Sequence, residues 1–150
     1  MNIIIDDLST NAVAKLLQEH LDDMYATSPA ESVHALDINK LKAPEITFFS
    51  AWQEQCLLGC VAIKQLSDHH GEIKSMRTTS KARNKAVATK LLEHVIAIAK
   101  QRNYRRLSLE TGVQDFFLPA RKLYEKFNFE YCEPFSDYTQ ATSRCLFSWN

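Results

Sequence analysis

Three basic side chains, Lys81, Arg83 and Lys85, alternate along a short polar stretch near the centre of the chain. The segment before them, 72–78, has strand character. From Val87 onward, apolar residues recur every three or four positions, as in an amphipathic helix. A strand–loop–helix junction directs unpaired backbone N–H groups and the positive end of the helix dipole to one point. With basic side chains around it, this junction is predicted to bind an anion.

The charge distribution along the chain supports such a site. The formal net charge is zero, which argues against a general nucleic-acid-binding protein. Between Lys74 and Arg106, however, ten basic residues accompany a single acidic one, Glu93, so most acidic residues lie elsewhere in the sequence. This asymmetry favours an anionic cofactor at the junction and a neutral or cationic second ligand nearby. A basic helix face that only contacts solvent is the alternative.

Strand and helix patterns on both sides of the junction predict an α/β fold in one domain spanning 1–150. The predicted elements are a strand 2–5, a helix 11–25, a short helix near 36–41, a hairpin of strands 45–53 and 56–66, a strand 72–78, a helix from 87, a strand 105–111, a helix after 115, and closing strands 129–132 and 144–149. A helix between strands 72–78 and 105–111 makes these two strands parallel neighbours through a right-handed crossover.

Single residues refine this scheme. In strand 72–78, strict alternation would place Ile73, Ser75 and Arg77 on one face and Glu72, Lys74, Met76 and Thr78 on the other. Asp115 is predicted to cap the following helix, in which Tyr124 lies at the edge of the apolar stripe. Asn128 is expected to adopt left-handed geometry at the end of that helix. Gly59, inside a strand, indicates a bulge or a close packing contact.

The cysteines and the first residues of the chain indicate the compartment. Cys56 and Cys60 belong to an apolar strand and are interpreted as small buried residues, and no CxxC pair is present. Reduced thiols and no metal site are therefore expected. The beginning of the sequence lacks the basic start and long apolar segment of a signal peptide, and no apolar run is long enough to span a membrane. We therefore expect a cytoplasmic protein.

Two motifs resemble those of the GNAT superfamily of acyl-CoA-dependent N-acetyltransferases. The family's cofactor motif has Gln or Arg, two residues, Gly, one residue, then Gly or Ala; here the sequence reads Arg-Asn-Lys-Ala-Val-Ala over 83–88. The segment Leu-Tyr-Glu-Lys-Phe-Asn-Phe over 123–129 is similar to the family's Leu-Tyr-Glu-Lys-x-Gly-Phe. Both glycines of the cofactor motif are alanine here, Ala86 and Ala88, and glycine at 86 would let the backbone approach a phosphate more closely. Phe117 also replaces an Asn that many members place near the pantetheine arm.

The resemblance implies a mixed, mostly antiparallel central sheet flanked by helices, with a splayed strand pair at the cofactor cleft. It also implies a set of acetyl-CoA-binding residues: Met76, Arg77, Thr78, Arg83, Asn84, Lys85, Ala86, Val87, Ala88 and Thr89. Tyr124 matches the family tyrosine that protonates the leaving sulfur. Glu72 and Glu110 are competing candidates for the base that accepts the amine proton, and ordered water is a third. His34 is a candidate residue of the substrate pocket.

These features lead to one main hypothesis and two alternatives. The main hypothesis is transfer of an acetyl group from acetyl-CoA to a primary amine of a small molecule or amino-acid-like substrate, with no metal. The first alternative is a module that binds acyl-CoA without catalysis, as the altered cofactor motif suggests. A nucleic-acid-binding protein ranks last, because aromatic residues do not interleave with the basic charges. An exposed edge strand in the closing hairpin would favour a homodimer.

Overall fold

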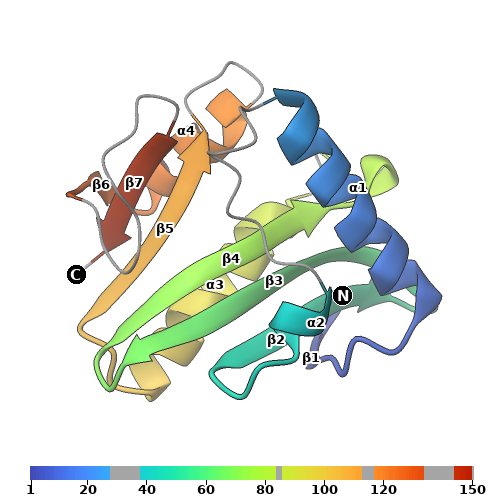
Figure 1. Ribbon diagram of the computed structural model, residues 1–150, viewed down its shortest axis with the longest axis horizontal. Coiled ribbons are helices and arrows are strands. Elements are labelled where there is room, and N and C mark those ends of the chain that lie inside the picture. Colours follow the sequence, from blue (N-terminus) through green and yellow to red (C-terminus); the bar gives the residue numbers. More distant parts are fainter. Residues whose placement is uncertain (28–37, 84–85, 113–116, 134–143, 150) are drawn as a thin grey trace.

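The computed structural model describes residues 1–27, 38–83, 86–112, 117–133 and 144–149 (Figure 1). Within this part of the chain, seven strands form one sheet in the order β1-β2-β3-β4-β5-β7-β6. The strands are β1 (Asn2–Ile5), β2 (Ile46–Gln53), β3 (Cys56–Ser67), β4 (His70–Thr78), β5 (Arg106–Gly112), β6 (Glu130–Tyr131) and β7 (Arg144–Trp149). The α-helices are α1 (Asn11–Thr27), α2 (Ile38–Leu41), α3 (Val87–Gln101) and α4 (Leu118–Lys126), and a short 3-10 helix covers Ser80–Ala82.

Neighbouring strands of the sheet are antiparallel, except that β4 and β5 run parallel. Helix α3 connects these two strands, because a parallel pair needs a crossover longer than a hairpin turn. The mixed, mostly antiparallel sheet and the parallel neighbours expected from the sequence are confirmed.

Helices cover both faces of the sheet: α1 and α2 lie on one face, and α3 and α4 lie on the other (Figure 1). The larger apolar core lies between the sheet and α3, where Leu91, Leu92 and Val95 are fully buried. The second core lies under α1 and α2 and includes Val13 and Leu41. Each helix therefore buries one apolar stripe against the strands, as its sequence period predicts.

The alternation predicted for β4 is wrong beyond Lys74. Ser75 has a positive φ of 54°, and the register between β3 and β4 shifts there, so that one extra residue enters β4. Such a β-bulge reverses the faces of the residues that follow it. Met76 consequently packs with Ile73 against the α3 core, while Arg77 points to the α1 side.

Other local expectations had mixed outcomes. Asn128 has the expected positive φ, 70°. The helix expected after Asp115 begins instead at Leu118, with Phe117 as a cap that makes no side-chain hydrogen bond; Asp115 itself lies outside the described residues. Proline at position 119 fits this later start, because the first turn of a helix does not need its missing N–H. Cys60 is fully buried as expected, whereas Cys56 is exposed.

In the part of the chain that the structure describes, no helix combines the length and apolar character required to cross a membrane.

Candidate active site

The strands β4 and β5 separate from one another after a short paired region. Their ladder runs from the pair His70–Arg106 to the pair Ile73–Leu109 and then stops, although β4 continues to Thr78. β5 also continues, to Gly112, paired with β7 on its other side. The two strands diverge in Figure 1 beyond this point. The bulge at Ser75 accounts for the divergence, because a bulge bends its strand and increases the local twist.

A buried tyrosine lies beside the bulge. Tyr124 on α4 is 6% exposed, and its hydroxyl group donates a long hydrogen bond to Met76 Sδ at 4.0 Å. Phe129 packs edge-on against the tyrosine ring, with 5.8 Å between ring centroids. Burial raises the pKa of Tyr124 to about 12, because the surroundings disfavour the phenolate. The hydroxyl group is therefore protonated at neutral pH.

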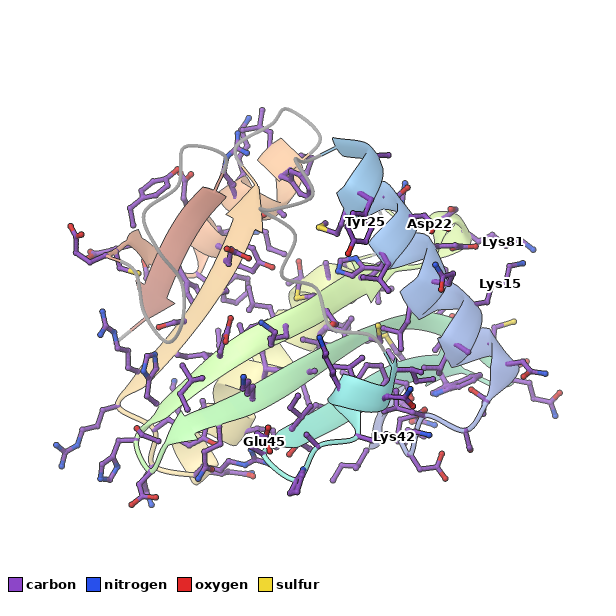
Figure 2. The ribbon with its side chains drawn as sticks, in the orientation of Figure 1. Lys15, Asp22, Tyr25, Lys42, Glu45 and Lys81 are labelled. Carbon is purple, nitrogen blue, oxygen red and sulfur yellow. The ribbon has the colours of Figure 1, made fainter. Side chains whose placement is uncertain are left out.

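The amino-terminal end of α3 has the features expected of an anion site. Ala86 caps the helix in left-handed geometry (φ 61°, ψ 17°) and offers no side-chain hydrogen bond, and the first turn carries no acidic residue. The first N–H groups of a helix have no partner inside it, so those of α3 are available to an external acceptor. Arg83 and Lys81 are exposed, and Lys81 extends away from the body of the protein (Figure 2).

Gly59 on β3 sets the distance between this helix and the sheet. A Cβ atom at this position would lie 2.7 Å from the carbonyl oxygen of Arg77 and 3.2 Å from a methyl carbon of Val87. The missing side chain thus lets the first turn of α3 pack closely on β3 beside the end of β4. This confirms the close packing contact that the sequence suggested for Gly59.

The two candidate bases, Glu72 and Glu110, occupy different positions relative to the gap that opens between β4 and β5 where their ladder stops. Glu72 is 2% exposed, lies in the paired region of β4, and forms an ion pair with Lys74 at 3.2 Å. Its partner in the ladder is Ser108, whose Oγ lies 2.7 Å from His70 Nε2. Glu110 is half-buried and lies just beyond the last β4–β5 pair. Glu110 therefore lies nearer the point of divergence along the strands.

The side chain of Arg77 is directed away from α3. It forms an ion pair with Asp23 on α1, with 2.7 Å between Nη2 and Oδ2. Arg77 is one of the predicted cofactor-binding residues. Its main chain belongs to the stretch of β4 that has no ladder with β5, and its side chain lies on the α1 side of the sheet. Asp23 was not predicted as a partner of Arg77, because nothing local in a sequence indicates which strand a helix residue will contact.

Three of the predicted site residues, His34, Asn84 and Lys85, lie outside the described residues. Val87 is buried, and Ala88 and Thr89 are half-buried in the first turn of α3. Among the residues that the structure does describe, no group of three or more His, Cys, Asp or Glu side chains is arranged to hold a metal ion.

Comparison with known proteins identifies the family. The sequence profile of the acetyltransferase (GNAT) family matches residues 13–129. The chain belongs to the GNAT family. It is 56% identical over 138 residues to the uncharacterized N-acetyltransferase YsnE of Bacillus subtilis, a match that covers 92% of this chain and 91% of that protein. It is also 47% identical over 133 residues to the uncharacterized N-acetyltransferase YedL of Escherichia coli, covering 89% and 84% of the two chains.

The fold matches solved structures as well. A putative acyl-CoA N-acyltransferase from Klebsiella pneumoniae superposes with a TM-score of 0.78 at 21% identity, covering 98% of this chain and 94% of that one. The GNAT fold expected from the two sequence motifs is thereby confirmed, and the protein is an N-acetyltransferase of this family. In the family the acetyl donor is acetyl-CoA, and the acceptor is an amine.

Proposed function

We propose that the protein transfers the acetyl group of acetyl-CoA to a primary amine of a small molecule or amino-acid-like substrate, by direct attack within a ternary complex. The contact between the buried Tyr124 hydroxyl group and Met76 at the β4 bulge carries this proposal. It brings a protonated phenol to the point where β4 leaves β5, which is where the thioester must lie if the pantetheine arm enters the gap between the strands.

The donor fits the residues that are present. The open amino-terminal turn of α3, with Ala86 to Thr89 and the cationic Arg83, would hold the pyrophosphate through backbone N–H groups. The main chain of β4 from Met76 to Thr78 would hold the pantetheine arm, because that stretch forms no ladder with β5. Ala86 is exposed, so its methyl group is not part of the packed core.

The reaction then needs three contributions from the chain. A backbone N–H group of β4 near Met76 polarises the thioester carbonyl as the amine nitrogen attacks its carbon. The C–N bond forms and the C–S bond breaks, and Tyr124 gives its phenolic proton to the departing sulfur. The proton lost by the amine passes to Glu72, to Glu110 or to an ordered water molecule.

Two measurements test this function. Calorimetry with acetyl-CoA should show binding, and release of free thiol should follow when a panel of primary amines is added. Binding without thiol release for every acceptor would support the non-catalytic acyl-CoA-binding module instead. Three expectations from the sequence stay predictions: a homodimer, a cytoplasmic location and the lack of a nucleic-acid partner. Size-exclusion chromatography, cell fractionation and a DNA-retention assay test them in that order.

A further inference from the structure

A pocket of about 450 Å³ opens at the edge of the sheet, where β1 ends beside β2. The ladder between these strands ends with the pair Ile5–Phe49, so no described strand pairs with residues 46–48 on that side. The volume of the pocket lies in the range of small-molecule sites. Apolar side chains form much of its wall: Ile5, Leu8, Leu41, Ile46 and Phe48.

This pocket is distant from the proposed cofactor site. That site is at the amino-terminal end of α3, whereas Arg102, which lines the pocket, follows the last residue of the same helix. The 15 residues of α3, at a rise of about 1.5 Å each, separate the two ends by roughly 20 Å. Figure 2 shows Lys42, another residue of the pocket, beside α2 and away from Lys81. A ligand in this pocket would therefore not occupy the place of acetyl-CoA.

Neutral groups position the guanidinium group of Arg102. Its Nη2 donates a hydrogen bond to Thr47 Oγ1 at 2.8 Å, and its Nη1 donates a longer one to the Tyr104 hydroxyl oxygen at 3.4 Å. That hydroxyl group in turn donates to Gln65 Oε1 at 2.7 Å, and Tyr104 is buried. Arg102 is thus held against a core residue, while no carboxylate among the described residues forms an ion pair with it.

The other charged groups of the pocket differ in how far they are already satisfied. Asp6 accepts hydrogen bonds at both carboxylate oxygens, one from a backbone N–H group at 2.7 Å and one from Ser50 Oγ at 2.6 Å. Asp7 accepts two hydrogen bonds from Ser9. Lys42, in contrast, is exposed and forms no ion pair within the described part of the chain. The two cations of the pocket are therefore available to an external anion, whereas the two carboxylates are engaged by their own chain.

We propose that this pocket binds a small monocarboxylate with an apolar body, such as an aliphatic or aromatic acid. Arginine carries five N–H donors in a planar fork that matches a carboxylate, and the contacts to Thr47 and Tyr104 engage only two of them. Lys42 adds a second positive charge, and the apolar wall receives the body of the ligand. The negative charges of Asp6 and Asp7 disfavour a dianion, which selects against phosphate monoesters.

Matched pairs of probes test the recognition of charge. Hexanoate and benzoate carry the proposed charge, and hexanamide and benzamide have nearly the same shape without it. In NMR titrations of isotope-labelled protein, the carboxylates should shift the amide signals of Thr47 and Phe48 and bind roughly tenfold more tightly than the amides, as expected for a charge-assisted hydrogen bond. Saturating acetyl-CoA should leave this binding unchanged. Absence of these shifts up to the solubility limit of the probes, equal affinities for acid and amide, or displacement by acetyl-CoA would overturn the proposal.

Two arginine variants separate a specific contact from general surface charge. Arg102→Gln should lower the affinity for hexanoate and benzoate roughly tenfold and leave the affinity for the amides unchanged. Arg105→Gln is the matched control, because Arg105 is also an arginine near the end of α3 but is exposed and does not line the pocket. It should bind the carboxylates like wild type. Equal losses in the two variants would show attraction by net charge alone and overturn the proposal.

A second pair of variants keeps the test valid if Arg102→Gln disturbs the packing around Tyr104. Ile5 lines the pocket and is 74% exposed, so changing its side chain removes little from the core. Ile5→Lys should bind the carboxylates several-fold more tightly than Ile5→Glu, because the two side chains place opposite charges beside the ligand, roughly 1 kcal/mol apart. The amides should not distinguish them. Equal carboxylate affinities in these two variants would contradict the proposed site.

Discussion

Gly59→Ala should weaken acetyl-CoA binding, although the residue itself need not touch the cofactor. The added Cβ would lie 2.7 Å from the carbonyl oxygen of Arg77, 3.1 Å from Leu91 Cδ1 and 3.2 Å from Val87 Cγ1. The first of these contacts is with backbone, so β3, β4 or α3 must shift by about half an ångström to restore van der Waals distances. Overpacking of this kind costs about 1–3 kcal/mol of folding free energy.

The displaced groups include both proposed walls of the cofactor site. Arg77 belongs to the end of β4, and Val87 begins α3. We therefore expect the melting temperature to fall by about 2–4 °C for each kcal/mol lost. The acetyl-CoA dissociation constant should rise roughly tenfold, because small misplacements of binding groups carry large penalties. Differential scanning fluorimetry and calorimetry with acetyl-CoA measure the two effects.

Gly71→Ala provides the matched control. Its Cβ would also meet a neighbour at 2.7 Å, but that neighbour is the ring of Tyr104, and Gly71 lies at the opposite end of β4. Neither glycine has a positive φ, so contact alone distinguishes the two sites. Gly71→Ala should lower stability and leave acetyl-CoA affinity unchanged. If both variants lose affinity equally, or if Gly59→Ala binds like wild type, the role assigned to this packing contact is wrong.

Four further predictions concern single residues. Tyr124→Phe should lower turnover by at least about 100-fold in the thiol-release assay while acetyl-CoA affinity stays nearly constant, and full turnover would remove the tyrosine from the mechanism. Glu72→Gln should slow transfer to a protonated amine more at low pH than at high pH; superimposable pH–rate curves would leave Glu110 or water as the proton acceptor. Ala86→Gly should raise acetyl-CoA affinity a few-fold, because glycine lets the backbone approach a phosphate more closely. The melting temperature should change little, because glycine avoids the cost of left-handed geometry, about 1 kcal/mol for alanine, but loses more backbone entropy on folding. Weaker acetyl-CoA binding by this variant would contradict the reasoning. His20 has a folded-state pKa of about 4, below its ordinary 6.5, so the unfolded chain gains a proton first as pH falls. The neutral His20 side chain therefore contributes fully to stability above pH 6.5, and this contribution, up to about 3 kcal/mol, is lost as the pH falls from 6.5 to 4. Urea unfolding over this pH range should show a smaller decline in the free energy of unfolding for His20→Asn than for wild type.

The sequence was sufficient for the order and type of the elements near the site. The strand over 2–5 and the strand over 144–149 have the predicted bounds, and β4 and β5 are parallel as predicted. These features follow from periodicity and from turn residues, which are properties of neighbouring positions. The left-handed geometry of Asn128 was predictable for the same reason, since it depends on the end of one helix.

The helix after β5 shows where local signals were insufficient. An aspartate at 115 has the right chemistry for a cap, yet α4 begins at Leu118. Cap propensity contributes only about 1 kcal/mol, and the packing of Tyr124 and Phe129 in the core outweighs it. The burial of Tyr124, at 6% exposure, likewise depends on the fold, because the helix pattern places this residue only at the edge of the apolar stripe.

The amino-acid sequence was enough to predict that a basic junction joins a strand to a helix and that Tyr124 and the β4 residues are candidates for one site. The bulge at Ser75, which places Met76 against Tyr124 and turns Arg77 toward Asp23, could be known only from the folded chain. A period-two pattern assumes an uninterrupted ladder, whereas the extra residue in β4 arises from its register with β3. Register depends on contacts between strands distant in sequence, and it is these contacts that assign each β4 side chain to the face on which it acts.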